Sequence, residues 1–150
     1  MVLFWNELGV IMGLYDNYEQ VHLYYLTLLL YDKYSELIPD NCDSRCIYST
    51  IINRAYYSAY SCSLLWLENT FGFKVKGKTD FYNVEEFQTE HKQVILELKK
   101  IGKFVLSDEL RQLKRLRKIA DYEPFSPLTL KEVQEAIDLM KDILSDTVLN

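Results

Sequence analysis

The stretch that decides the fold is residues 47–69, IYSTIINRAYYSAYSCSLLWLEN. Its apolar residues recur every three or four positions, the spacing that places side chains on one face of an α-helix. Several residues near its middle are small, so another helix can approach closely there. Asp43 or Ser44 can cap the first turn by accepting a hydrogen bond from a free backbone N–H. The pattern predicts a long helix whose inward face is made by Ile47, Ile51, Ala55, Ala59, Cys62 and Trp66.

The same spacing appears before this stretch and is lost after it. Residues 18–37 are predicted as a second long helix, which the turn residues of Pro39-Asp40-Asn41 end. Residues 71–88 show no clear period and are predicted as a loop, long enough to carry a function. The inward positions of the 18–37 helix are predicted to be Val21, Tyr24, Tyr25, Leu28, Leu29 and Tyr31.

Start and stop signals divide the rest of the chain. Thr89 can cap a helix over 89–103, and Gly102 near its end is a typical C-terminal signal. Ser107 is predicted to cap the next helix, and Thr129 forms a capping box with Glu132 at the start of the last one. No segment alternates with the period of a strand. We therefore expect an all-α, up-and-down bundle of about five helices in a single domain over residues 1–150. Residues 1–16 are expected to form a docking arm or a short extra helix.

Composition allows a protein with a substantial core. The chain has 150 residues, of which 49% are apolar and 26% are charged, as in ordinary globular domains. Twelve tyrosines are an unusual number for this length, and tyrosine suits interfaces as well as cores.

Charge is unevenly distributed. The formal net charge is −5, yet 12 of the 17 lysines and arginines fall within residues 74–118. A basic centre between acidic flanks can make a local positive surface on a net-negative protein. A solvated helix face that only confers solubility explains the same pattern equally well.

Cysteines and apolar runs favour a cytoplasmic protein. Cys42, Cys46 and Cys62 are odd in number, and residues 1–15 lack the cationic start of a secretory leader. No second pair completes a zinc set, so we expect no metal, and we expect no cofactor. The apolar run over residues 21–31 is too short to span a bilayer.

The helix after Ser107 carries the densest chemistry. Arg111, Arg115, Lys118 and Tyr122 are spaced by four, three and four, so they share one face and could bind phosphate and stack on a base. Arg117 lies four residues before Asp121, which allows an ion pair along the helix. That pair could be purely structural.

Arg54 interrupts the apolar pattern of the first helix quoted. A charge in such a place has to be paired or line a cleft. Two interpretations stay open: a partly buried ion pair with Asp121 or a glutamate, or a contact to phosphate or another ligand.

Three segments, NRAYYSAY (53–60), TEHKQV (89–94) and LRKIADY (116–122), carry a resemblance to a known family. The chain resembles the HEPN superfamily, small helical bundles of higher eukaryotes and prokaryotes. The first segment is similar to the family's RAYYAAF segment, and the third to the L-R-x-x-A-D-Y ending of one prokaryotic branch. The second is similar to the family's T-H-x-x-V helix start, with Glu90 inserted. The similarity runs in order from about residue 18 to residue 144.

The resemblance implies a function in RNA biology. Many HEPN proteins are metal-free ribonucleases that dimerise around an arginine and a histidine four to six residues later. Here Ala120 stands where the histidine would be, and either Arg115 or Arg117 can fill the arginine position. HEPN proteins often pair with a small nucleotidyltransferase in toxin–antitoxin systems.

Three functions follow as alternatives. The chain is a dimeric binding module for a partner, for RNA or for a nucleotide; it is a metal-free ribonuclease with a degenerate motif; or it is a purely structural helical module. The expected catalytic residues are Arg115, Arg117 and Tyr122. The expected ligand- or RNA-binding residues are Arg54, Tyr57, His91, Arg111, Lys118 and Asp121. His91, at a helix start, is expected to be an exposed cap or surface residue, with proton transfer as the other option.

Overall fold

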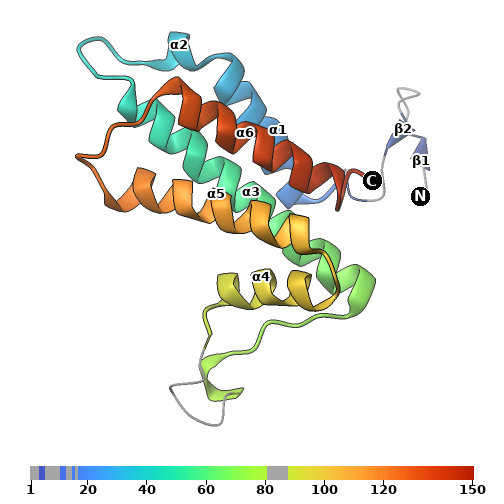
Figure 1. The fold of residues 1–150 in the computed structure, drawn as a ribbon. Coiled ribbons are helices and arrows are strands. Elements are labelled where there is room, and N and C mark those ends of the chain that lie inside the picture. Colours follow the sequence, from blue (N-terminus) through green and yellow to red (C-terminus); the bar gives the residue numbers. More distant parts are fainter. Residues whose placement is uncertain (1–3, 6–10, 13–14, 16, 81–87) are drawn as a thin grey trace.

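The quoted stretch forms the longest helix of the protein, α3 (Arg45–Phe71), in a computed structural model that describes residues 4–5, 11–12, 15, 17–80 and 88–150. Figure 1 shows α3 running through the bundle, with α1 (Glu19–Asp32) before it and α5 (Phe104–Tyr122) and α6 (Leu130–Ser145) after it. The shorter helices are α2 (Tyr34–Leu37) and α4 (Glu90–Lys100), and η1 (Lys78–Asp80) is a single 3₁₀ turn. The predicted all-α bundle is confirmed.

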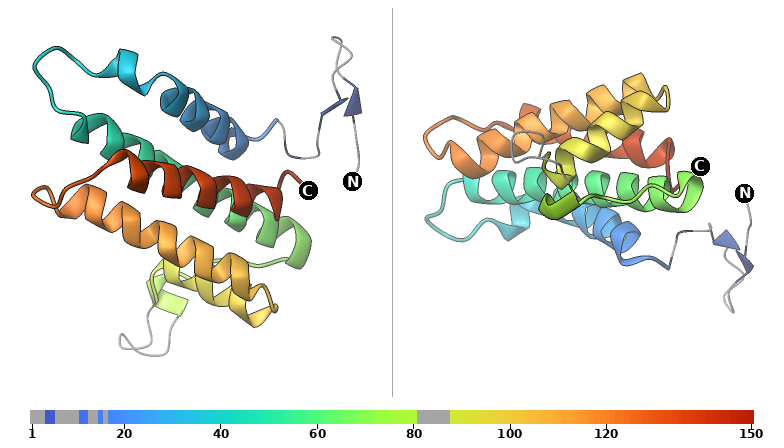
Figure 2. Two further views of the ribbon diagram at one scale, coloured as in Figure 1. Left: turned by 45° about the horizontal axis from the view of Figure 1, so that its top comes forward. Right: turned by 90° about the horizontal axis from the view of Figure 1, so that it is seen from below.

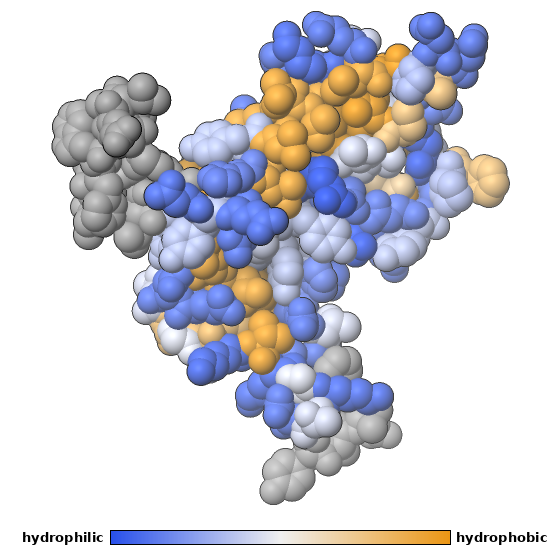
Figure 3. Space-filling view, turned by 180° about the vertical axis from the view of Figure 1, so that it is seen from behind, coloured by the Kyte–Doolittle hydropathy of each residue, from blue (hydrophilic) through white to orange (hydrophobic). Residues whose placement is uncertain are grey.

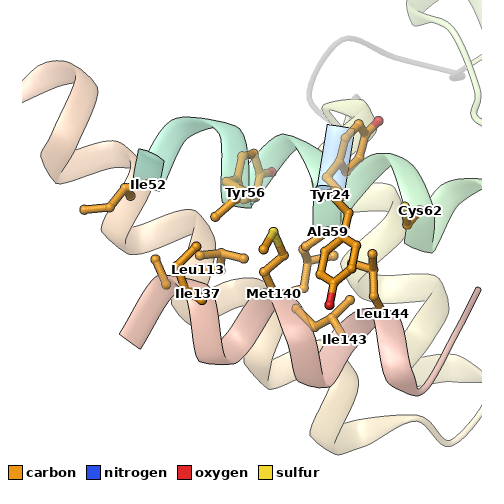
Figure 4. Close-up of a cluster of buried hydrophobic side chains, with 14 of the residues drawn as sticks. Tyr24, Ile52, Tyr56, Ala59, Cys62, Leu113, Ile137, Met140, Ile143 and Leu144 are labelled. Carbon is orange, nitrogen blue, oxygen red and sulfur yellow. The ribbon is translucent and has the colours of Figure 1, made fainter. Parts of the chain in front are cut away.

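Helix α3 is the centre of the packing because it contacts α1 on one side and α5 and α6 on the other. Both views in Figure 2 place α1 on the side of α3 that faces away from α5. Figure 4 shows side chains from all four helices meeting in the core. A fully buried Ile or Leu side chain contributes roughly 1.5–3 kcal/mol by leaving water. The core side chains labelled there are Tyr24, Ile52, Tyr56, Ala59, Cys62, Leu113, Ile137, Met140, Ile143 and Leu144.

A glycine turn joins α4 to α5 and fixes their hairpin. Gly102 has a φ of 83°, a left-handed conformation that glycine adopts without a Cβ penalty. Its N–H donates to the carbonyl of Lys99 over 3.1 Å, and the N–H of Lys103 donates to that of Leu98 over 2.9 Å. These two bonds make a Schellman motif, so the predicted stop signal at Gly102 is confirmed.

Ser107 does not cap α5, contrary to the prediction. The helix begins three residues earlier, at Phe104, and Ser107 is buried within its first two turns. Its hydroxyl donates to the carbonyl of Ile95 on α4 over 2.9 Å. Ser107 therefore links α5 to α4 through a hydrogen bond, and it does not cap a helix.

The other predicted caps are confirmed. The Thr89 side chain accepts from the N–H of Lys92 at the start of α4, and Thr129 and Glu132 form the capping box of α6. At α3 the Asp43 carboxylate accepts from the N–H of Arg45 over 3.0 Å, whereas Ser44 makes no side-chain cap.

The N-terminal part of the bundle departs from the prediction in two ways. The 18–37 helix is broken at Lys33 into α1 and α2. In addition, Tyr25 and Leu29 point outward, with 50% and 56% of their surface exposed. Apolar residues surround α1 on all sides, so periodicity alone could not identify the buried side.

Four residues of the N-terminal arm form strands. β1 (Phe4–Trp5) pairs antiparallel with β2 (Ile11–Met12), with Phe4 opposite Met12. The alternative of a short extra helix is wrong at these positions. The rest of the predicted arm lies mostly outside the described residues, and its docking role stays a prediction.

Candidate phosphate-binding site

Arg117 lies at the centre of a polar group of side chains on α3 and α5. Its Nε donates to Asp121 Oδ2 over 2.7 Å, so the ion pair predicted along the helix is confirmed. Its Nη2 donates to the hydroxyl oxygens of Tyr57 (3.1 Å) and Tyr122 (3.2 Å). The guanidinium also lies over the rings of both tyrosines, 5.2 and 5.3 Å from their centroids. The fork of this arginine is therefore fixed in direction.

Two residues of α3 complete this group. Asn53 donates its amide N–H to Asp121 Oδ2 over 2.8 Å, and its Oδ1 accepts two bonds from Arg54. Arg54 is exposed and lies over the Tyr57 ring. Among the described residues it forms no ion pair with Asp121 or with a glutamate, so the buried-pair interpretation of Arg54 is wrong. We call these six residues the Arg117 cluster: Asn53, Arg54, Tyr57, Arg117, Asp121 and Tyr122.

Partial burial keeps the central ion pair intact. The side chains of Arg117 and Asp121 are 17% and 21% exposed. Burial is the largest single influence on the pKa of Arg117 and acts to lower it, but the hydrogen bond and charge of Asp121, together with Tyr57 and Tyr122, outweigh burial and raise the pKa. The guanidinium therefore stays charged at any physiological pH.

His91 lies beside the cluster and is half-buried, which corrects the expectation of an exposed side chain. Its Nδ1 lies 2.5 Å from the hydroxyl of the buried Tyr56, and its ring stacks on Tyr60 with the centroids 4.1 Å apart. Burial, Lys114 and Arg117 lower the pKa of His91 against the opposing effect of Glu90. The imidazole is therefore neutral near pH 7.

Lys114 brings another positive charge close to the same place. It is half-buried on α5, and burial lowers its pKa, as do the neighbouring cations Arg117 and Lys92. Within the described part of the chain no carboxylate forms an ion pair with it. Lys92 on α4 and Lys114 and Arg117 on α5 thus lie close enough for their charges to interact, and among the described residues only Arg117 of the three pairs with a carboxylate.

The remaining predicted residues lie apart from this group. Arg111 pairs with Asp108 over 2.9 Å in the exposed part of α5. Arg115 and Lys118 are exposed and have no hydrogen bond or ion pair with any described residue. Of the expected basic face, only Tyr122 joins the Arg117 cluster.

Sequence reasoning did not select Asn53, Tyr56 or Lys114 for the site. Asn53 and Tyr56 lie within the NRAYYSAY segment, next to Arg54 and Tyr57, and this position could have identified both of them as site residues. Lys114 had no such signal, because its importance arises from the packing of α4 against α5.

Shallow hollows adjoin Arg54 on both sides. One is lined by Ser49, Thr50, Asn53, Arg54 and Asp121. The other is a groove of about 580 Å³ between α1 and α3, lined by Glu19, Gln20, His22, Leu23, Leu26, Arg54 and Ser61. A purely structural module predicts that Arg54 is fully paired within the bundle and adjoins no cleft, and these hollows count against that alternative.

Two other features are absent from the described residues. They contain no group of three or more His, Cys, Asp or Glu side chains placed to hold a metal ion. None of their helices is long and apolar enough to cross a membrane.

The fold and the site define a class: an all-α bundle with an arginine-centred polar cluster on two of its helices. Comparisons with protein-family models, with curated proteins and with solved structures found no match to this chain.

The cluster presents hydrogen-bond donors to an incoming ligand. Both tyrosine hydroxyl oxygens already accept from Arg117, so their protons are directed elsewhere and can be donated. Arg117 Nη1 makes no hydrogen bond with the described residues and keeps two further N–H donors. Together with the Lys114 ammonium, these groups match the oxygens of a phosphate.

Proposed function

We propose that this chain is a cytoplasmic HEPN-type protein that binds RNA or a nucleotide through a phosphate held at the Arg117 cluster. The observation that carries the proposal is the fixed fork of Arg117, beside donors on Nη1, Tyr57 and Tyr122 and beside Lys114, none of which is taken up by an acceptor or a carboxylate within the described residues. A bound phosphate would accept these donors and offset the repulsion among the three cations.

Aromatic faces support a nucleotide over a bare phosphate. Tyr122 is 63% exposed although its hydroxyl bonds to Arg117 and the guanidinium lies over its ring, so the part of the ring away from Arg117 is open to a base. Stacking of a base on an aromatic ring contributes about 1–3 kcal/mol. The arrangement therefore suits a phosphate with an adjoining base.

The resemblance to HEPN proteins supports two further parts of the proposal. We propose that the chain acts as a homodimer and that its partner is a small nucleotidyltransferase, in a toxin–antitoxin pair. Co-purification of the chain with such a partner tests the second part, and a chain that purifies alone from its own cells contradicts it.

The binding proposal is tested by fluorescence anisotropy with a labelled single-stranded RNA in EDTA. We expect Arg117→Lys, which keeps the charge and loses the fork, to raise the Kd about 10- to 100-fold. Arg115→Lys is the matched control, because it lies two residues away on the same helix without a contact in the described chain. Equal effects of the two substitutions, or no RNA binding by the wild-type protein at low salt, would contradict the proposal.

Cleavage of RNA is a second candidate function, and the position of His91 favours it. The ring is neutral and lies close enough to Arg117 for that charge to lower its pKa, so it could accept a proton from a ribose hydroxyl. The same RNA is followed on a gel in EDTA. Cleavage that His91→Gln abolishes without changing the Kd would support this function. RNA that the wild-type protein leaves uncut would contradict it, and phosphate binding would then be the only function proposed.

A further inference from the structure

The solvent-facing side of α1 is apolar, whereas the solvent-facing side of a helix in a monomeric protein is normally polar. Tyr18, Tyr25, Leu26 and Leu29 follow the spacing of one helix face and are 42–56% exposed. Figure 3 shows this side of the molecule, with a continuous apolar area over α1. Large exposed apolar areas mark surfaces that another molecule covers.

The adjoining groove between α1 and α3 has an acidic residue at one end and a basic residue at the other. The Cys62 thiol donates to the carbonyl of Gln20, so the start of α1 lies level with this part of α3. Glu19 therefore lies at this end of the groove. Arg54 lies eight residues before Cys62, about 12 Å along α3, at the other end. Leu23 and Leu26 line the groove as well.

We infer that a second copy of this chain covers the α1 face, in a twofold arrangement centred near Leu26. In a twofold interface each surface meets itself, so an acidic end in one copy faces the basic end in the other. Glu19 of each copy then pairs with Arg54 of the other, and the leucines of the two copies pack between the pairs. One surface thus supplies both complementary charges and the apolar centre.

This interface would connect the dimer to the phosphate site. Arg54 bonds to Asn53 and lies over Tyr57, both members of the Arg117 cluster. Glu19 from the second copy would thus lie at the edge of each cluster and draw Arg54 away from the ligand. The inference rests on the proposed homodimer but not on RNA binding.

Charge reversal with rescue tests the pairing by sedimentation velocity over a range of concentrations. We expect the wild-type protein to be a dimer, and Glu19→Arg or Arg54→Glu to raise the dimer Kd at least ~10-fold through like-charge repulsion. The double variant Glu19→Arg with Arg54→Glu restores the opposite charges and should recover dimerisation. Asp138→Arg, an exposed reversal on α6, is the control and should have no effect.

Leu26→Asp tests the apolar centre separately, because Leu26 is half exposed and its replacement leaves the core intact. We expect a folded monomer, with unchanged circular dichroism. A wild-type monomer at every concentration, a dimer that Leu26→Asp leaves intact, or a double variant that stays monomeric would overturn the inference. A monomer that still binds RNA would overturn this interface alone, whereas a dimer that binds no RNA would overturn the phosphate site alone.

Discussion

Lys114 is a cation that the fold holds in an unfavourable place. It is half-buried, the charges of Arg117 and Lys92 act on it, and no described carboxylate pairs with it. Proteins tolerate such local destabilisation where a ligand compensates for it. A lysine kept for stability would have the opposite character, with a partner and favourable charges around it.

The two roles make opposite predictions for Lys114→Met. If Lys114 serves phosphate binding, the free energy of unfolding in urea stays the same or rises, because like-charge repulsion and the burial of an ammonium are removed. Affinity for RNA falls in the same variant. Loss of stability together with unchanged RNA affinity would contradict the assignment. Lys118→Met on the same helix is the control, since Lys118 is exposed and makes no hydrogen bond or ion pair with the described residues.

His91 allows a test by pH. Burial lowers its pKa below the usual 6.5, with Lys114 and Arg117 lowering it further. Because the folded pKa is depressed, the unfolded chain takes up a proton first as the pH falls below about 6.5. Stability is therefore lost from that pH down to the folded pKa. We expect His91→Gln to remove this part of the loss.

The same shift can be followed directly by NMR titration of the His91 ring. Lys114→Gln removes a nearby positive charge and should move the pKa of His91 upward, and Arg115→Gln should move it much less. An unchanged pKa in the Lys114 variant would show that the two side chains do not interact.

Site residues were predictable from sequence where they fall on one helix or in one segment. Arg117 and Asp121 are four apart, so their pairing followed from helix geometry. The neutral, stacked state of His91 did not follow, because Tyr56 and Tyr60 approach it from another helix. The choice between Arg115 and Arg117 was undecided by spacing, and the structure places Arg117 alone among the tyrosines.

At the scale of the elements, the end of α5 is held by a residue from the start of α3. Arg45 Nη2 donates to the carbonyl of Glu123 over 2.7 Å, and its Nε donates to that of Ser126 over 3.1 Å. The carbonyls at a helix C-terminus lack partners within the helix, and a cation there also complements the helix dipole. Arg45 therefore fixes the last turn of α5, which carries Asp121 and Tyr122.

We expect Arg45→Gln to lower the free energy of unfolding by about 1.5 kcal/mol, since bonds from a charged donor are lost. RNA affinity should fall as well, because the last turn of α5 would be less fixed. Urea denaturation and anisotropy measure the two effects. Arg111→Gln is the control, as Arg111 is exposed and pairs only with Asp108 among the described residues. A variant as stable as the wild-type protein would contradict this role.

Helices and their caps were largely predictable, and the errors have a common cause. Thr129 and Gly102 act through neighbours in sequence, so local rules identified both. Ser107 bonds to a different helix, and the exposed side of α1 is as apolar as its buried side. Local patterns do not contain the tertiary contacts that decide these two cases.

At the scale of the whole molecule, a net-negative protein presents a local positive site. The formal charge is −5, and Arg117, Lys114 and Lys92 gather at one place. Binding of a single-stranded RNA through three cations should weaken with salt, with a slope of log K against log salt of about −2. Lys92→Gln should make that slope less steep by about 0.7, and Lys131→Gln on α6 should leave it unchanged. A salt-independent affinity would exclude phosphate contacts.

The central position of α3 also has a consequence for how the chain folds during synthesis. α3 contacts α1, which precedes it, but also α5 and α6, which follow it. Until the ribosome has added α5, which ends at Tyr122, and α6, which ends at Ser145, the faces of α3 that contact these two helices lack their neighbours and expose apolar side chains to solvent. The packing around α3 is therefore complete only once α6 has been synthesised, and apolar surface exposed before that point is of the kind that chaperones bind.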